Sequence, residues 1–391
     1  MMAGGGAGGL VEAEPVAARA RVEELRPRRP SAAASGAAAA GLRILAVSRQ
    51  WQGANDYAFV RAFRRAGHSV VVVDPASHVP PGWSSGPLRY VRRALYGRMA
   101  RRLNEEILAR AGSFRPHLFF AFKGREVTAG TLRRLRRSGI VSINFYPDTG
   151  FRDHGAYLAE AVAEYDWIFT TKTFGVDDLA GNYGMRRASF LPHGFDPEVH
   201  RPVALAEDEV EKYACDVTFV GARTAKKERT LAHLVAARPH LRYRIWGGTR
   251  WRLPAARDLS FGEQLTGLEY AKALAGARIA LSLLYEGDPG APCGDDITAR
   301  TFEVPAAGGF MLHERTDAAL ALFAEGEECA FFSSPEELVE KVDRYLADPA
   351  ERRRVALNGH ERVSRSGHSV DDRAAAVLQA YGCIAAAGRT R

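Results

Sequence analysis

Short apolar runs alternate with amphipathic stretches along most of the chain. Residues 43–47 form an apolar run, residues 57–66 carry apolar side chains at helical spacing, and residues 70–73 are all valine. This order predicts a strand, a helix and a second strand. The pattern returns over residues 118–145, and a further strand is expected at 167–171. Because strands separated by helices usually pair in parallel, the first half of the chain is predicted to form a doubly wound α/β sheet.

A cluster of chain breakers divides the chain near residue 200. Residues 191–197 read Leu-Pro-His-Gly-Phe-Asp-Pro, and a polar segment follows them. A second series of strands and helices begins at residue 216, and its clearest helix start is the capping box that opens at Ser334. The sequence therefore predicts two Rossmann-like domains and a short tail, at residues 41–200, 201–381 and 382–391.

Residues 1–40 differ from the rest because they are rich in Ala, Gly and Arg and carry almost nothing large and apolar. Such a composition predicts a disordered tail, and it fits neither a secretory signal nor a transit peptide. No later stretch has the length of apolar sequence that a transmembrane helix needs. The four cysteines are scattered without a close pair, which favours a reducing compartment. We expect a soluble cytoplasmic protein.

The charge is divided unevenly between the two predicted domains. Lys and Arg exceed Asp and Glu by nine over residues 41–200, whereas acidic residues exceed basic ones by two over residues 201–391. An excess of this kind points the first domain toward an anionic partner, which could be a phospholipid surface, a charged glycan or nucleic acid.

Residues 88–103 are predicted to form a basic amphipathic helix, with an apolar residue at every fourth position and arginines on the other faces. The favoured interpretation is an ordinary helix that packs its apolar stripe on the sheet. Peripheral contact with a membrane, toward a lipid-linked acceptor, is the alternative. Nucleic acid is not expected as a partner, because no aromatic residues are interleaved with the arginines.

One candidate ligand site follows the strand at 216–220, where the chain continues through Gly221 and Arg223 to Lys226 and Lys227. Glycine lets a backbone approach a ligand closely, and cations beside a helix start suit a diphosphate. A solvated helix surface explains the lysines equally well.

A second candidate is the segment 295–310, in which a polar loop enters a short helix and leaves it through a double glycine. Glu303 is followed by small or rigid residues that suit close packing, so its carboxylate could accept hydrogen bonds from the hydroxyls of a ribose. Asp295 lies eight positions earlier, in the loop.

Asp148 is the candidate catalytic base. It follows the strand predicted at 140–145, which places it at the carboxyl edge of a parallel sheet, where such sheets bind ligands. An aspartate that forms a turn before Gly150 is the competing interpretation.

Taken as a set, these segments resemble the CgeB-like glycosyltransferases, a spore-maturation-type family of the GT-B fold that is related to glycosyltransferase family 4. The resemblance covers about residues 140–381. It rests on the segment at 191–202 and on the pattern Arg300-x-Phe302-Glu303-x-Pro305-Ala306-x-Gly308-Gly309-Phe310, with Gly359-His360-Glu361-Arg362 further on. It implies a GT-B enzyme whose two domains face a central cleft, with the acceptor held by the first domain and the nucleotide-sugar donor held by the second.

The resemblance also implies roles for single residues. Glu303 matches the second glutamate of a Glu-x7-Glu motif and would hold the donor ribose. Asp295 stands where the family has the first glutamate, and it would meet the donor sugar with a side chain shorter by one methylene. The remaining matches would lie on the donor diphosphate or beside it: Gly221, Arg223, Lys227 and Gly308.

The sequence thus predicts a hexosyltransferase that uses a UDP- or GDP-type sugar donor and acts on a glycan, a lipid-linked acceptor or a protein. No metal and no other cofactor is expected, because cations and helix dipoles neutralise the leaving diphosphate in GT-B enzymes. Two alternatives remain open. One is a GT-B-shaped binding or structural protein without turnover, and the other is a nucleotide-sugar epimerase of the same architecture.

Overall fold

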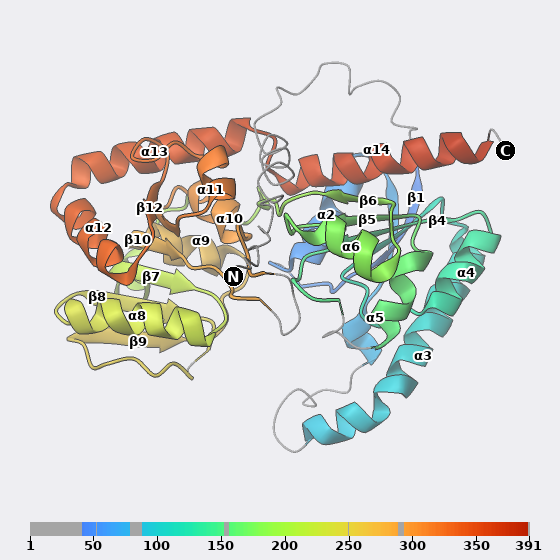
Figure 1. Cartoon of the computed structure of the whole chain (residues 1–391), viewed down its shortest axis with the longest axis horizontal. Helices are drawn as coiled ribbons and strands as arrows, with labels where there is room; N and C mark the ends of the chain where they lie inside the picture. Colours follow the sequence, from blue (N-terminus) through green and yellow to red (C-terminus); the bar gives the residue numbers. More distant parts are fainter. Residues whose placement is uncertain are drawn as a thin grey trace, which may run out of the picture.

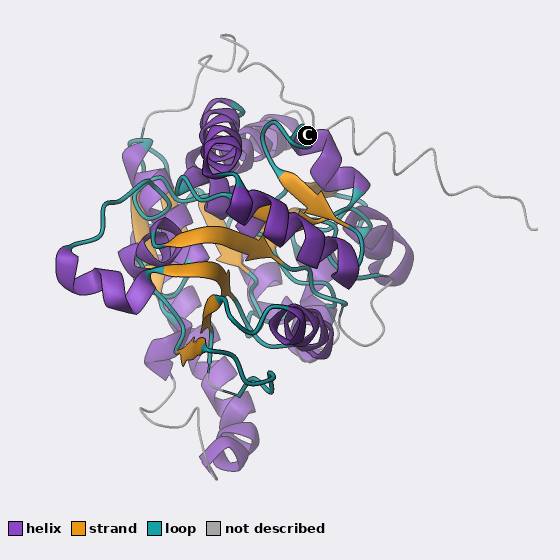
Figure 2. Ribbon diagram, turned by 90° about the vertical axis from the view of Figure 1, so that its left-hand side faces the viewer, coloured by secondary structure: helices purple, strands orange, loops and turns teal. Residues whose placement is uncertain are grey.

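The chain builds two parallel β-sheets that lie side by side, each with helices on both faces (Figure 1, Figure 2). The structure, a computed structural model, describes residues 41–51, 53–78, 88–151, 156–248, 250–287 and 293–389. The predicted tail at 1–40 lies outside the described residues. Both halves of the chain have the doubly wound α/β organisation that the alternating pattern predicted.

The first sheet has the strand order β2-β1-β3-β4-β5-β6, and all neighbouring strands are parallel. Its strands are β1 (Arg43–Val47), β2 (Ser69–Val73), β3 (Leu118–Phe122), β4 (Val141–Tyr146), β5 (Trp167–Thr170) and β6 (Ala188–Phe190). The connecting helices are α2 (Asn55–Arg65), α3 (Leu88–Phe114), α4 (Ala129–Arg137), α5 (Ala156–Ala161) and α6 (Gly175–Tyr183), with short 3-10 turns at Pro75–His78 and Val162–Glu164.

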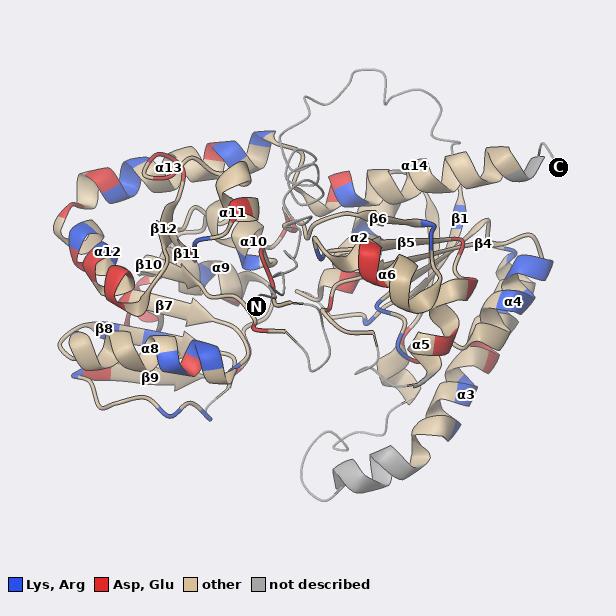
Figure 3. Ribbon diagram, in the orientation of Figure 1, with Lys and Arg blue, Asp and Glu red and all other residues tan. Residues whose placement is uncertain are grey.

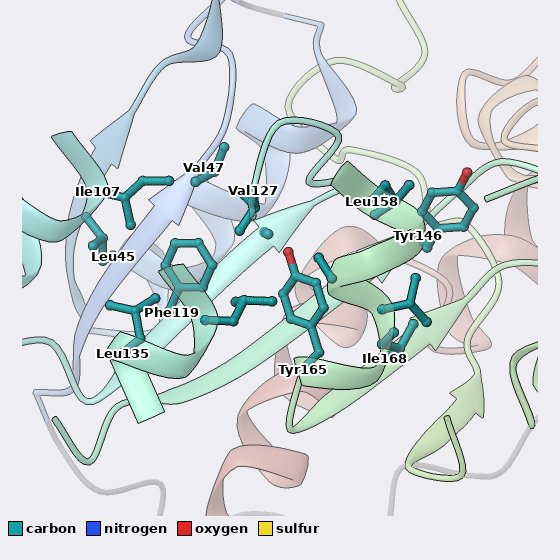
Figure 4. Packing of buried hydrophobic residues seen from close by; sticks show 14 of the residues in the cluster. Leu45, Val47, Ile107, Phe119, Val127, Leu135, Tyr146, Leu158, Tyr165 and Ile168 are labelled. Atoms are coloured by element: carbon teal, nitrogen blue, oxygen red, sulfur yellow. The ribbon is translucent and has the colours of Figure 1, made fainter. Parts of the chain in front are cut away.

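Each face of the first sheet buries its own apolar cluster. On one face Leu103 and Ile107 of α3 and Leu135 of α4 pack against Phe119 of β3 (Figure 4). On the other face Phe59 of α2 lies 5.2 Å from the ring of Phe120, the next residue of β3. Because successive side chains of a strand point to opposite faces, a strand buried on both sides reads as a continuous apolar run.

The second sheet has the order β12-β11-β10-β7-β8-β9, again parallel throughout. The chain starts in the middle at β7, moves to one edge through β9, and returns to the other side at β10. Its strands are β7 (Cys215–Val220), β8 (Arg242–Trp246), β9 (Asp258–Gly262), β10 (Ala277–Ser282), β11 (Met311–Glu314) and β12 (Ala330–Phe332). A sheet of this order binds ligands at the point where the direction reverses, which here lies between β7 and β10.

The helices of the second half follow the predicted series. They are α7 (Val210–Tyr213), α8 (Ala225–Ala237), α9 (Leu268–Ala275), α10 (Arg300–Ala306), α11 (Asp317–Leu322), α12 (Pro335–Ala347) and α13 (Pro349–Arg365), with a 3-10 turn at Glu207–Glu209 before α7. The predicted cap of α12 is formed, since the Ser334 hydroxyl accepts a hydrogen bond from the Glu337 amide at 3.2 Å.

The last helix, α14 (Val370–Arg389), corrects two expectations about the end of the chain. It was assigned to the second domain, but Val370, Ala374 and Val377 are buried against α2 and β4 of the first sheet. The tail predicted at 382–391 is helical as far as Arg389, and Ile384 packs on the same cluster. The boundary at residue 200 stays a prediction.

Helix α3 extends eleven residues beyond the predicted end at 103. Ala100, Leu103, Ile107 and Ala111 are buried apolar residues of this helix, so its later part packs on the sheet. Of the apolar stripe predicted within 88–103, Leu103 is buried and Leu95 and Met99 are half-buried. None of the helices in the described part of the chain is long and apolar enough to cross a membrane.

Candidate active site

A cavity of about 750 Å³ lies between the two halves, at the carboxyl ends of both sheets. The first half contributes the loop after β1 and the residues that follow β3, β4 and β5. The second half contributes the residues that follow β7 and β10, together with α8, α9 and α10. The polar and aromatic lining includes Trp51, Lys123, Asp148, Lys172, His193, His200, Lys227, Tyr270, Tyr285, Asp295, Arg300 and Glu303.

Arg300 joins the ends of β7 and β10, the two strands between which the order of the second sheet reverses. Its guanidinium donates to the carbonyls of Val220 and Leu283, at 3.3 and 2.8 Å, and it stacks on the Phe219 ring at 5.3 Å. A Cβ on Gly221 would lie 2.7 Å from an Arg300 nitrogen, so the close approach of this guanidinium requires glycine at position 221. Gly221 therefore lies in the cavity as expected, beside an arginine that the sequence analysis did not single out.

Lys227 is the lysine of α8 that reaches the cavity. Only 5% of it is exposed, and its ammonium lies over the Tyr285 ring at 5.6 Å. Burial, and then the nearby charge of Arg300, lowers its pKa to about 8. Among the described residues it forms no ion pair, whereas the neighbouring Lys226 pairs with Glu314. A buried cation without a paired carboxylate is suited to receive an anion.

The structure does not bring Arg223 or Gly308 to this cavity. The Arg223 guanidinium pairs with Glu228, the fourth residue of α8, and lies outside the lining. Gly308 has a φ of +78°, and a Cβ added to it would lie 3.4 Å from Pro202 Cγ. Its positive φ lets the chain turn between α10 and β11, so a structural role accounts for this glycine.

Glu303 lies one helical turn after Arg300 on α10, so both side chains face the cavity. His200, from the segment between the domains, approaches it. The His200 Nδ1 accepts a hydrogen bond from the Asp196 amide at 2.9 Å, so the neutral ring carries its proton on Nε2, 3.8 Å from Glu303 Oε1. Tyr270 packs edge-on against His200, and burial raises its pKa well above the usual value. His200 therefore lies beside Glu303 at a distance too long for a direct hydrogen bond.

Asp295 forms an ion pair across the cavity with Lys172, which follows β5 of the first sheet. Both side chains are nearly buried, with 9% and 6% exposed. The adjacent residues make a second contact between the halves, because the Thr173 hydroxyl donates to the Asp296 carboxylate. The carboxylate predicted to meet a sugar therefore already has a cation from the opposite domain beside it.

Asp148 lies in the cavity two residues after β4, and its carboxylate pairs with Lys123, which follows β3. Lys123 has a φ of +66°, a conformation that is costly for a residue with a side chain and that recurs at functional sites. His193 lines the same wall. Burial, and then the charge of Lys172, lowers the pKa of His193 to about 3, so its imidazole is neutral.

Four residues that line the cavity had no role predicted from the sequence: Lys123, Lys172, His200 and Arg300. Two of them could have been found, since Lys123 and Lys172 each follow a predicted strand at the edge where parallel sheets bind ligands. Arg300 stands three positions before Glu303, on the same face of one helix. No group of His, Cys, Asp and Glu among the described residues has a geometry that could hold a metal ion.

Residues 223–379 match the model of a family described as Glycosyl transferase-like. No curated protein matches the chain. Among solved structures, sucrose-phosphate synthase from Thermosynechococcus elongatus has a TM-score of 0.64 at 16% identity, over 88% of this chain and 100% of that one. A glycosyltransferase from Rickettsia africae has a TM-score of 0.60 at 10% identity, over 88% and 98% of the two chains.

HepE from Anabaena, solved in complex with UDP-glucose, has a TM-score of 0.57 at 12% identity, over 90% of this chain and 100% of that one. Identities this low show the fold alone, and the predicted GT-B fold is confirmed. The narrower resemblance to CgeB-like proteins stays a prediction. The chain has the GT-B fold, and its second half contains a glycosyltransferase-like domain.

Proposed function

We propose that this protein is a hexosyltransferase that takes its sugar from a nucleotide-sugar donor bound in the cavity between the two halves. The observation that carries the proposal is Lys227, a buried ammonium that lines the cavity with Arg300. Asp295, Glu286 and Glu314 act on its charge from a distance, but none of the described carboxylates lies within ion-pair distance of it. Two cations at the reversal point of a parallel sheet suit a diphosphate, which carries the complementary charge and many acceptor oxygens.

A diphosphate at Lys227 and Arg300 determines the other donor contacts that we propose. Glu303, beside His200, accepts hydrogen bonds from the ribose hydroxyls, and Asp295 meets the sugar. Gly221 leaves room beside the diphosphate. We assign no donor contact to Arg223, because its guanidinium is paired with Glu228. A UDP-type donor is our first choice, since the similarly folded HepE was solved with UDP-glucose.

The chemistry needs no bound metal in this proposal. Negative charge grows on the leaving diphosphate as its bond to the sugar breaks, and Lys227 and Arg300 stabilise that charge. If the anomeric centre is inverted, Asp148 is the carboxylate that we assign to remove the proton from the acceptor hydroxyl. The Lys123 ammonium forms an ion pair with this carboxylate. The acceptor is a glycan, a lipid-linked molecule or a protein.

Isothermal titration with UDP, GDP and ADP tests the donor site. Replacing Lys227 by Gln should weaken binding of the preferred nucleotide about tenfold to a hundredfold, because a hydrogen bond to a charged group is lost. Lys226→Gln is the matched control, since Lys226 pairs with Glu314. Likewise Arg300→Lys should weaken binding while Arg223→Lys should not.

Turnover separates the proposal from its two alternatives. With the sugar conjugate of the bound nucleotide, a transferase releases the free nucleoside diphosphate and an epimerase yields an altered nucleotide sugar. A binding protein leaves the conjugate unchanged. Absence of binding by every nucleotide would overturn the donor site itself, and an equal loss in the Lys226 and Lys227 variants would overturn its position.

A further inference from the structure

A second cavity, of about 1090 Å³, opens at the other edge of the first sheet. Its lining comes from the starts of β1 and β4, the loop before β3, the ends of α3 and α4, and the end of α14. This is the amino edge of the strands, whereas the cavity described above lies at their carboxyl edge. Because β1 has five residues, the two cavities are separated by a distance on the order of 15 Å.

The lining of this cavity is strongly basic. Five arginines and one aspartate contribute to it: Arg43, Arg115, Arg134, Arg136, Arg137 and Asp166. Arg136 is neutralised, since it pairs with Glu164 and approaches Asp166 at 3.6 Å. The other four arginines have no carboxylate partner among the described residues. Figure 3 shows basic positions along α4 and α3 at this end of the molecule.

Part of the basic lining is fixed in place. The Arg43 Nε donates to the carbonyls of Phe114 and Arg115, at 3.1 and 2.8 Å, and the Arg43 amide donates to His117 Nδ1 at 3.0 Å. Arg115 has a φ of +48°, which is uncommon for a residue with a side chain. The loop after α3 is therefore held in a costly conformation, with Arg115 beside Arg43. The like charges of these two side chains repel unless an anion offsets the repulsion.

Arginines in the last turn of a helix need no ligand, because they interact favourably with the helix dipole. That accounts for Arg134 and Arg137 on α4. Arg43, from a strand, is held by the Phe114 carbonyl at the end of α3. Neither explanation accounts for Arg115, which lies in a loop. Four arginines from three separate elements thus converge on one cavity, and no single element explains them.

The rest of the lining is apolar. Leu108 and Ala111 of α3 form one wall, and Tyr381 and Ile384 of α14 form another. A small inorganic anion would leave these walls uncovered. A molecule with an anionic head and an apolar portion matches both parts of the lining, as the head group and upper acyl chain of a phospholipid do.

We propose that this cavity binds the head group of an anionic phospholipid and attaches the protein to a membrane surface. The site is distinct from the donor cavity, and it does not depend on the proposed transferase activity. Since the two cavities lie at opposite edges of one sheet, the attached protein presents its central cleft away from the lipid.

Co-sedimentation with vesicles tests the proposal. The protein should bind vesicles that contain phosphatidylglycerol and should not bind vesicles of phosphatidylcholine alone. The double variant Arg134→Gln/Arg137→Gln removes two unpaired cations from exposed positions, so it should fold normally. It should bind the anionic vesicles about thirtyfold more weakly, given the usual contribution of each basic residue near a charged surface.

The matched control is Arg229→Gln/Arg353→Gln, which removes the same charge from exposed positions of the second half. It should bind vesicles like the unaltered protein, and both double variants should bind nucleotide normally. Equal losses in the two double variants would overturn the proposal in favour of diffuse charge. So would the absence of vesicle binding, or binding of inorganic phosphate at these arginines without binding to lipid.

Discussion

At the residue scale, Lys227 keeps a positive charge where water scarcely reaches. Its pKa of about 8 in the folded protein lies below the ordinary value of 10.5, so the protonated form is disfavoured by burial. Each unit of such a shift corresponds to about 1.4 kcal/mol. The Lys227 charge thus destabilises the fold and lies at a ligand cavity. Such a group is expected to serve in ligand binding and not in stability.

Replacing Lys227 by Met should therefore stabilise the free protein while removing nucleotide binding. We expect the free energy of unfolding near neutral pH to rise by up to about 3 kcal/mol. The folded pKa is lower than the unfolded one, so the unfolded state binds more protons between these two values, and the stability of the unaltered protein rises with pH in that window. The advantage of the variant should accordingly shrink as the pH rises from about 8 to above 10.

Urea unfolding at several pH values, with and without nucleotide, measures both effects. Lys226→Met is the control, and it should change stability by less than about 1 kcal/mol, because the Lys226 ion pair is partly exposed. A Lys227→Met variant that is less stable and still binds nucleotide would contradict the role given to this residue.

The carboxylates of the candidate site and Lys227 could be predicted from the sequence, whereas the role of Arg300 could not. Asp295 and Glu303 stand in a recognisable spacing, and both line the cavity. Arg300 depends on carbonyls that belong to Val220 and Leu283, 80 and 17 positions away in the chain. Arg223 was predicted to meet the diphosphate from its place after a strand and from the family resemblance, but its guanidinium pairs with Glu228, five positions along.

At the element scale, α13 lies tightly against α10, the helix that carries Arg300 and Glu303. The contact passes through Gly359, which is buried. A Cβ at this position would lie 2.4 Å from the Glu328 carbonyl oxygen and 3.7 Å from the Pro305 Cβ. The neighbouring His360 fixes the same contact, because its Nδ1 lies 3.0 Å from the Pro305 carbonyl.

Substituting Ala at Gly359 should lower the free energy of unfolding by about 1–3 kcal/mol, since one added methyl group forces backbone to move in a closely packed region. Gly382→Ala provides the opposite case within α14. Nothing lies within 4 Å of a Cβ there, so alanine should stabilise the helix by about 0.5–1 kcal/mol. Urea unfolding of the two variants gives both values, and a Gly359→Ala protein as stable as the unaltered one would contradict this packing.

The elements themselves were largely predictable, because apolar spacing and caps act locally. The Ser334 cap and the strands of both sheets appear where the pattern indicated them. The destination of α14 was not predictable in this way. Its apolar residues show that one face is buried, but a helical pattern does not say which sheet covers that face, and the chain crosses back to the first sheet.

At the scale of the whole molecule, two kinds of ion pair join segments far apart in sequence. Lys172 and Asp295 meet inside the cleft with less than a tenth of either side chain exposed. Arg65 of α2 and Asp371 of α14 meet on the surface, with 35% and 42% exposed, at 2.6 Å. Loss of the buried pair should therefore change the free energy of unfolding much more than loss of the exposed pair.

Removing one partner of the buried pair leaves an uncompensated charge, so Lys172→Met should lower the free energy of unfolding by about 3–5 kcal/mol. The double variant Lys172→Met/Asp295→Leu should regain most of that loss, because neither charge remains. Arg65→Met should cost less than about 1 kcal/mol, since water screens an exposed pair. Double-mutant cycles in urea measure all three changes in the free energy of unfolding.

If Lys172→Met costs as little as Arg65→Met, water reaches Lys172 and Asp295, and the two halves stand apart in solution. A large cost means that the halves remain closed without a donor, so any sugar that reaches Asp295 must share that carboxylate with Lys172.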